Sequence, residues 1–214
     1  MAVVLVIGAS GGIGLEAVKR ALAEGHRVRA LARRAASIDI DRAELQKIAG
    51  DALDRAAVSA ALPGAEAVLQ TLGAPKDLAT TLWGTRLFSG STRVLIDAMR
   101  EQRVRRLVAV TGLGAGDSRG HGGPLYNAIA FPLVLKRIYD DKDVQEQMIR
   151  ASGLDWTIVR PGLLRNGRAT GRARALTEPK DWTMGSVTRA DVAAFLVREA
   201  FERHFVGRTP LLIE

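Results

Sequence analysis

The residues at positions 8–14 read GASGGIG, so four glycines fall within seven positions. The run follows an apolar segment and precedes a helical pattern, a context in which glycines let the backbone turn tightly and approach a ligand closely. The start of the following helix offers free N–H groups and a positive dipole end to phosphate groups. We expect Gly8 to form the turn, Gly11 and Gly12 to approach a pyrophosphate, and Gly14 to pack the helix against the strand. The alternative is a tight strand-to-helix turn with no ligand.

A second candidate binding feature lies at the end of the next apolar run, where Arg33 and Arg34 close the sequence RVRALARR. A site for NAD usually carries an acid about 20 residues after the glycine loop, which accepts from the ribose 2′-hydroxyl. Here the nearest acids come later, at Asp39 and Asp41. Guanidinium groups suit the 2′-phosphate of NADP, because each can donate two parallel hydrogen bonds to phosphate oxygens. We therefore expect NADP as the cofactor. The alternative is a solvated arginine pair at a strand end.

The elements that must position these residues alternate along the chain between short apolar runs and segments of helical periodicity. Continuous apolar runs are typical of parallel strands covered on both faces. The alternation predicts an α/β fold, a doubly wound parallel sheet of the Rossmann type with right-handed crossovers. The expected strands are 3–7, 27–32, 45–48, 65–72, 107–110, 156–159 and 211–213. The expected helices are 15–24, 54–62, 88–102, 143–152 and 188–203, the last opened by a capping box of Thr188 and Asp191.

The length of the chain, 214 residues, favours one large domain. We expect a single NAD(P)-binding domain over 1–214, with a small C-terminal substrate lobe built from about 113–140 and 163–187. The segment 120–139 begins glycine-rich and becomes apolar around Pro132, which is compatible with a lid over an apolar substrate or with a buried helix. The arginines at 165, 168, 172 and 174 form either a solvated loop or a surface for an acidic substrate or partner.

Composition excludes several classes of protein. The absence of cysteine rules out disulfides and cysteine–metal sites and fits a reducing compartment. The N-terminal apolar run is too short for a secretory signal, and the longest later run, 128–135, is far below a membrane span, so we expect no membrane partner and a cytoplasmic location. No metal is expected. The formal net charge is +8, and 25 of the 31 basic residues are arginine. Aromatic residues make up only 5%, without a basic tail or zinc motif, so nucleic acid is not expected.

Seven motifs occur in order over nearly the whole chain: GASGGIG, ALARR, Gly50-Asp51, VLQTLGAP, LVAVTGLGAG, SGLDWTIVRPG and TRADVAAFLV. Together they resemble an atypical short-chain dehydrogenase/reductase of the NAD(P)-binding, NmrA-like group, and the biliverdin-IXβ/flavin reductase type is similar. The resemblance implies that the phosphates are held by Gly8, Ser10, Gly11, Gly12, Ile13 and Gly14, and the 2′-phosphate by Arg33, with Arg34 beside it. It implies that Asp51 and Ala52 flank the adenine, that Thr71, Leu72 and Gly73 border the nicotinamide-side ribose, and that Thr111, Pro161, Gly162 and Leu163 lie beside the nicotinamide.

Simpler interpretations stay open for three of these positions. Asp51 is also compatible with a turn or a helix cap, Gly73 with a plain strand exit, and Arg160 in the motif DWTIVRPG with a loop anchor. The position of the motifs favours a binding role, because ligands of parallel sheets bind at the carboxyl ends of the strands, near the point where the strand order reverses.

The catalytic residues depart from the main short-chain branch, which uses a serine and a Tyr-x-x-x-Lys pair. Tyr126 is followed by Ala130 at the lysine position, and Tyr139 has Lys142 only three residues on. Gly112 stands where the serine is often found, although Thr111 keeps a hydroxyl. We therefore expect Thr111 and Lys142 to act, with Thr111 near the nicotinamide ring and Lys142 on the ribose. The alternative for Lys142 is a surface lysine in the sequence DDKD. In either case Glu146, one turn on, is a candidate partner for Lys142.

The missing proton donor limits the reaction. Reduction of a ketone leaves an alkoxide that needs a positioned acid, whereas a reduced flavin or quinone is a delocalised anion that solvent can protonate. The sequence therefore favours an NADPH-dependent oxidoreductase that acts on a small-molecule soft acceptor such as a flavin, a quinone or a tetrapyrrole. Two alternatives are a non-catalytic, redox-sensing NADP-binding regulator and an NADP-dependent epimerase or isomerase. The oligomeric state is left open.

Overall fold

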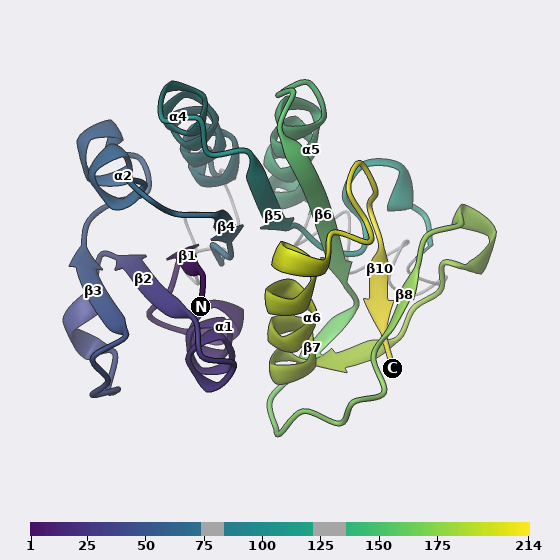
Figure 1. Cartoon of the computed structure of the whole chain (residues 1–214). Coiled ribbons are helices and arrows are strands. Elements are labelled where there is room, and N and C mark those ends of the chain that lie inside the picture. The colour runs from purple at the N-terminus through teal and green to yellow at the C-terminus, as the bar shows by residue number, and fades with distance from the viewer. Residues whose placement is uncertain (74–83, 122–135) are drawn as a thin grey trace.

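A mostly parallel sheet of eight strands, in the order β3-β2-β1-β4-β5-β6-β10-β8, forms the centre of the molecule (Figure 1). The structure, a computed structural model, describes residues 1–73, 84–121 and 136–214. The neighbouring strands are parallel except for the antiparallel pair of β10 and β8. In chain order the strands are β1 (Val3–Ile7), β2 (Arg27–Ala32), β3 (Leu45–Ala49), β4 (Ala67–Gln70), β5 (Arg106–Val110), β6 (Asp155–Pro161), β8 (Arg174–Leu176) and β10 (Leu211–Ile213).

Helices cover both faces of this sheet, as Figure 1 shows. On one face lie α1 (Gly12–Ala23) and α6 (Arg189–Glu202), and on the other lie α2 (Arg55–Ala61), α4 (Leu87–Glu101) and α5 (Lys136–Arg150). Alternate residues of β1 serve the two cores: Val4 and Val6 pack on the side of α1 and α6, and Leu5 and Ile7 on the other side. This arrangement confirms the doubly wound α/β fold predicted from the sequence.

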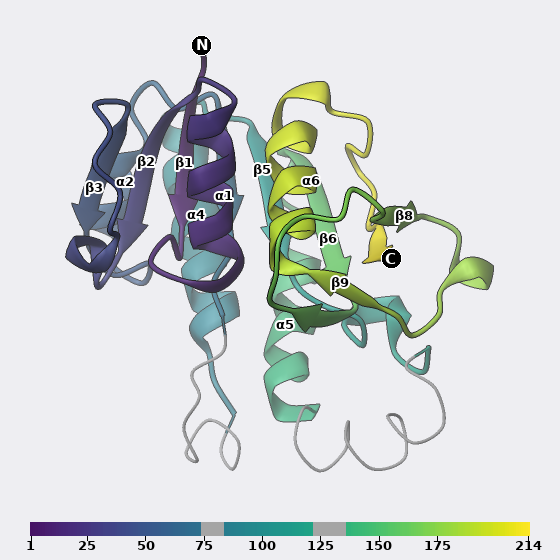
Figure 2. The ribbon, with the colours of Figure 1, turned by 90° about the horizontal axis from the view of Figure 1, so that it is seen from below.

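The order of the strands reverses between β1 and β4. The chain runs outward from β1 to β2 and β3, and then returns to place β4 on the other side of β1. Ligands of open parallel sheets bind outside the carboxyl ends of the strands at such a reversal. Figure 2 shows β1, β2 and β3 pointing toward one edge of the molecule, and α1 begins at that edge.

A second, two-stranded sheet pairs β7 (Leu163–Arg165) with β9 (Ser186–Thr188). Neither strand was expected from the sequence, and nor was β8, which joins the edge of the main sheet. The region also contains the short 3-10 helix η4 (Pro179–Asp181), while η1 (Ala35–Ser37) and η2 (Gly116–Ser118) follow β2 and β5. The proposed boundaries of a substrate lobe stay a prediction. Residues 122–135, with Tyr126, Ala130 and Pro132, lie outside the described residues.

Two helices begin earlier than the sequence pattern predicts. Helix α1 begins at Gly12 rather than Leu15, so the last two glycines of the loop are part of its first turn. Helix α5 begins at Lys136 rather than Asp143. Its first turns were missed because the buried face is largely polar and gives no apolar pattern. That face consists of Ile138, Asp141, Lys142, Gln145, Glu146 and Ile149. No helix within the described ranges has the length and apolar character needed to cross a bilayer.

The expected capping box at the start of α6 is only half correct. The Thr188 hydroxyl accepts from the Asp191 N–H at 3.0 Å, as predicted. The Asp191 carboxylate does not return to the Thr188 N–H, which donates to Glu214 instead. The Asp191 carboxylate accepts instead from the Thr188 hydroxyl at 2.6 Å and from the N–H groups of Thr170 and Gly171 at 2.9 Å each. Asp191 therefore ties the loop before β8 to the helix.

Candidate active site

The glycine loop connects β1 to α1 with a close approach between helix and strand. Gly8 has a φ of +88°, and a Cβ on it would lie 3.0 Å from the backbone carbonyl of Thr71. A Cβ on Gly14 would collide with the Gly8 carbonyl oxygen. Only glycine fits at either position. These contacts agree with the turn and packing tasks that the sequence predicts for the two residues.

The two middle glycines face open space. Among the described residues, apart from the adjacent chain and helix backbone, no atom lies within 4 Å of a Cβ built on Gly11 or on Gly12. The N-terminus of α1 has no side-chain cap, and its first turn contains no acidic residue. Uncapped N–H groups at the positive end of a helix dipole, with free space in front of them, form a site suited to phosphate. The local structure thus fits the pyrophosphate of a dinucleotide.

Arg33 and Arg34 lie directly after β2, and both are exposed. Among the described residues, neither guanidinium takes part in an ion pair or a side-chain hydrogen bond. Asp51 and Ala52 follow the neighbouring strand β3, whose last residue Ala49 stands opposite Ala32. The Asp51 carboxylate accepts from the Leu53 N–H at 2.9 Å, and Asp54, not Asp51, caps α2. The adenine-side candidates therefore meet at the ends of β2 and β3.

Thr71, Leu72 and Gly73 follow β4 and lie beside the glycine loop. The Thr71 hydroxyl donates to the Ile7 carbonyl oxygen at 2.8 Å, so it is used to join β4 to β1. Just before it, the buried Gln70 amide bonds Thr92 of α4 at 2.9 Å and Gln145 of α5 at 3.2 Å. Sequence reasoning missed this polar hub, since a strand-end glutamine usually faces solvent.

Lys142 is almost completely buried at the end of β5, which excludes the surface interpretation. Its ammonium group donates to the Thr111 carbonyl oxygen and lies 4.8 Å from the centre of the Phe88 ring. Burial lowers the pKa of Lys142 to about 8, although the nearby charges of Glu146 and Asp141 act to raise it. Tyr139 lies beside it: the ring centre is 5.4 Å from the ammonium group. A Cβ on Gly112 would lie 2.6 Å from the Tyr139 Oη, so the tyrosine leaves no room for a side chain there.

Glu146 does not pair with Lys142 as the sequence suggested. It accepts from Arg160 Nε at 3.0 Å and Nη2 at 2.6 Å, and from the Thr111 hydroxyl at 2.8 Å. Arg160 is fully buried and also pairs with Asp117 at 2.5 Å, so it connects the helix α5 to the segment after β5 rather than anchoring a single loop. Burial acts to lower the pKa of Arg160, but its bonds and charge contacts with Glu146 and Asp117 outweigh this and raise it. An arginine inside the apolar strand sequence DWTIVRPG was the signal that a buried acid must lie nearby.

The segment after β6 lies next to this cluster. The Leu113 N–H donates to the Pro161 carbonyl oxygen at 3.0 Å, which joins the ends of β5 and β6. A Cβ on Gly162 would collide with the Gly185 carbonyl oxygen, and Leu163 is 53% exposed. The predicted residues thus gather along one edge, from β3 at one side to β6 at the other. Within 1–73, 84–121 and 136–214, no three His, Asp or Glu side chains group to form a metal site.

Comparison with known proteins gives matches over nearly the whole chain. A family described as NAD(P)H-binding matches residues 8–203. A solved structure of ChuY, an anaerobillin reductase from Escherichia coli O157:H7, is 29% identical with a TM-score of 0.79, covering 99% of this chain and 97% of that one. ChuY from E. coli strain CFT073 is 30% identical with a TM-score of 0.78, covering 100% and 97%. An uncharacterized sugar epimerase, YhfK of Bacillus subtilis, is 31% identical over 160 residues, 68% of this chain and 71% of YhfK.

Proposed function

The chain belongs to the NAD(P)H-binding family, and from this premise we propose that it is an NADPH-dependent reductase that transfers hydride to a soft acceptor such as a flavin, a quinone or a tetrapyrrole. The family match confirms the resemblance to atypical short-chain dehydrogenases/reductases. It makes a nicotinamide cofactor the basis of whatever chemistry the chain performs. The choice of NADPH, the acceptor and the catalytic roles are the parts that we propose.

The residues at the carboxyl edge fit the cofactor. The open space before Gly11 and Gly12, at the uncapped start of α1, suits the pyrophosphate. The exposed guanidinium groups of Arg33 and Arg34 suit a 2′-phosphate. When bound, the nicotinamide supplies the hydride, and the protein's task is to position the ring and exclude water.

The arrangement at the end of β5 is the observation that carries the acceptor proposal. The Thr111 hydroxyl donates a hydrogen bond to Glu146, and Gly112 has no side chain that could offer a hydroxyl. A serine that would help to bind and polarise a ketone oxygen is therefore missing from this position. A flavin, quinone or tetrapyrrole makes no such demand, because its reduced anion is delocalised and can take a proton from solvent. The name of the similar ChuY, an anaerobillin reductase, favours the tetrapyrrole among these acceptors.

Lys142 has a positioning task in this proposal. Its ammonium group is held by the Thr111 carbonyl oxygen at the strand end, where the family resemblance places the nicotinamide ribose. A donor fixed in this way can hydrogen-bond a ribose hydroxyl and orient the ring. Lys142→Ala is expected to weaken NADPH binding and to slow hydride transfer through misplacement of the ring.

Tyr139 supplies the test of the proposal, because its hydroxyl lies against Gly112 at the end of β5. It is the one tyrosine among the described residues. Loss of a positioned general acid typically costs about 10²–10⁴-fold in rate. With a soft acceptor, Tyr139→Phe should lose less than about tenfold, well below that range. Tyr126→Phe, the other tyrosine of the chain, should behave in the same way. The measurement is single-turnover oxidation of NADPH with flavin, quinone and linear tetrapyrrole acceptors.

Three outcomes separate the alternatives. A loss of about a hundredfold in either phenylalanine variant would restore a carbonyl-reductase mechanism, because such a loss lies in the range for a positioned acid. Binding of NADPH without transfer to any acceptor would favour the redox-sensing regulator. The similarity to YhfK favours the epimerase as a second candidate, and it predicts interconversion of a sugar substrate with no net consumption of the cofactor.

A further inference from the structure

Two buried arginine–glutamate pairs lie at opposite ends of β5 and β6. Arg160 and Glu146 meet at the carboxyl end, and Arg106 and Glu199 meet at the amino end. The shortest N–O distance is 2.6 Å in both pairs, and none of the four side chains is more than 4% exposed. The two pairs are therefore alike in chemistry and in burial, and they differ in what surrounds them.

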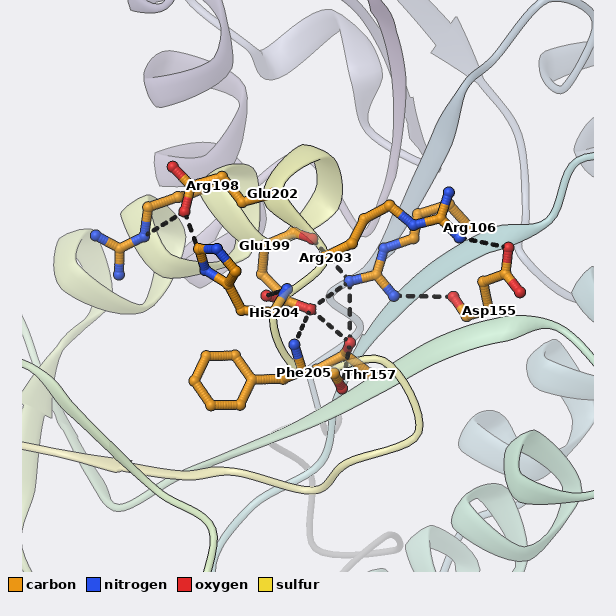
Figure 3. A network of polar contacts seen from close by, with 9 residues as sticks. All are labelled: Arg106, Asp155, Thr157, Arg198, Glu199, Glu202, Arg203, His204 and Phe205. Carbon is orange, nitrogen blue, oxygen red and sulfur yellow. Dashed lines mark hydrogen bonds and ion pairs between the residues drawn. The ribbon is translucent and has the colours of Figure 1, made fainter.

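The pair at the amino end is held by backbone groups and by the Thr157 hydroxyl (Figure 3). Glu199 Oε1 accepts from Arg106, from the Thr157 hydroxyl at 2.9 Å and from the Phe205 N–H at 3.0 Å, while Oε2 accepts from the His204 N–H at 3.0 Å. These bonds fix the chain as it leaves α6. None of the residues that the sequence or the resemblance places at the cofactor takes part in them, so this pair has a structural task.

The pair at the carboxyl end is connected to the candidate active site. Glu146 accepts the Thr111 hydroxyl at 2.8 Å, and the carbonyl oxygen of the same Thr111 accepts from Lys142. Lys142 and Glu146 lie one turn apart on α5, and together they bind the carbonyl oxygen and the hydroxyl of Thr111. The backbone of Gly116 closes over the pair: a Cβ there would lie 2.6 Å from Arg160 Nη2 and 2.7 Å from Glu146 Oε2.

We propose that Glu146 is a positioning residue of the active site, which fixes Thr111 beside the buried Lys142 ammonium group, with Arg160 holding the carboxylate in place. This inference rests on the proposed function, because it assigns a task to Glu146 in that same site. Neither the family match nor the similar proteins assign a task to this residue.

The charges around Lys142 determine the direction of the effect. On α5 it has Asp141 and Tyr139 as neighbours besides Glu146, on α4 it faces the Phe88 ring, and on β5 the Thr111 carbonyl. Arg160 on β6 pairs with Glu146 and with Asp117 on η2. Burial lowers the pKa of Lys142 and the charge of Glu146 raises it. Removal of that charge must lower the pKa further, so the ammonium form will be lost at a lower pH.

The experiment compares Glu146→Gln with Glu199→Gln, which removes the same charge from the matched pair at the other end of the strands. The chain has six lysines, so ¹³C-labelled lysine gives few signals, and Lys142→Ala identifies the one of interest. We expect the pKa of Lys142 to fall by about one unit in Glu146→Gln, as for loss of a nearby opposite charge. It should stay unchanged in Glu199→Gln. The titration is done with and without NADP and needs no turnover.

Kinetics supply the second readout. Glu146→Gln should lower kcat for NADPH oxidation by about tenfold or more, as for a misplaced reacting group, and should move the high-pH limb of the rate to lower pH. Glu199→Gln should leave kcat and the pH profile as they are. Glu146→Asp keeps the charge but withdraws it from Thr111, so the pKa of Lys142 should stay close to that of the unmodified chain while kcat falls.

Similar behaviour of the two glutamine variants in both readouts would overturn the proposal. If Glu146→Gln does not fold, Glu146→Asp decides: an undiminished kcat together with unchanged NADPH affinity would overturn it as well. If the unmodified chain reduces none of the acceptors, the proposed function fails. A fall in the Lys142 pKa that is specific to Glu146→Gln would still support the positioning task in that case.

Discussion

Arg33 and Arg34 determine the choice of cofactor in our proposal. A hydrogen bond to a charged group is worth roughly 1.5–3 kcal/mol, which corresponds to about ten- to a hundredfold in affinity. We expect at least a tenfold preference for NADPH over NADH, and its loss in the double variant Arg33→Ala/Arg34→Ala. Calorimetric titration with both cofactors is the measurement. Arg27→Ala is the control, since Arg27 is exposed at the opposite end of the same strand. Equal affinities in the unmodified chain would contradict the assignment.

Gly11 offers the cleanest test of the phosphate site. Its backbone is extended, with a φ of −176°, and a side chain there would enter the open space before α1. Gly11→Val should therefore keep the fold and lose cofactor binding, whereas Gly12→Val also forces a branched residue to a φ of +55°. Thermal unfolding and calorimetry separate the two effects. Gly11→Ala, with a smaller side chain, should bind with intermediate affinity. Normal NADPH binding by Gly11→Val would show that the phosphates lie elsewhere.

Single residues were predicted best where their type and spacing have one physical meaning. The spacing of Gly8 and Gly14 indicated a close contact between helix and strand, and the structure has that contact. Glu146 and Arg160 could not be paired from the sequence, because they lie on different elements and Glu146 is one of four acids on α5. A charged arginine within an apolar strand is a signal for a buried acid, but it does not say which of these acids is the partner.

At the scale of the element, α5 shows why the apolar pattern alone failed. The four residues of DDKD contact different parts of the molecule: Asp140 pairs with Lys136 and Arg119, Asp141 accepts from the start of α4, Lys142 donates to Thr111, and Asp143 accepts from the Gly116 N–H. A helix that buries polar side chains carries no apolar stripe, so only its final turns looked helical in the sequence.

Asp141 caps the start of α4 from another helix, beside the local bond in which the Thr85 hydroxyl accepts from the Leu87 N–H at 3.0 Å. Its carboxylate accepts from the N–H groups of Phe88 at 2.9 Å and Ser89 at 3.4 Å, and Arg86 at the cap position makes no side-chain bond to the helix. Asp141→Ala should lower the free energy of unfolding by about 1–3 kcal/mol, because buried donors lose their acceptor. The neighbouring Asp140→Ala, which breaks only exposed pairs, should cost about 1 kcal/mol or less. Urea unfolding measures both, and equal losses would contradict the capping task.

At the scale of the whole molecule, alternation of strand and helix was enough to predict the sheet, and the site at its carboxyl edge stays a prediction. The strands β1, β4, β5 and β6 have buried runs that are typical of a parallel sheet covered on both faces. The small sheet of β7 and β9 was out of reach, because strands of three residues show no period and all of β7 is exposed. Such strands are formed by the packing around them rather than by their own sequence.

The two buried ion pairs also differ in how much chain each must close, and this has a consequence for the order of folding. Glu146 and Arg160 are 14 residues apart, whereas Arg106 and Glu199 are 93 apart. Closing the longer loop costs about 1.7 kcal/mol more in chain entropy. The helix–strand unit of α5 and β6 should therefore form early in folding, and the segment after α6 should be fixed late. In stopped-flow experiments, Glu146→Gln should mainly slow refolding and Glu199→Gln should mainly speed unfolding, and the reverse pattern would refute this order. The end of β6 in the candidate site is then in place before the last residues of the chain are fixed.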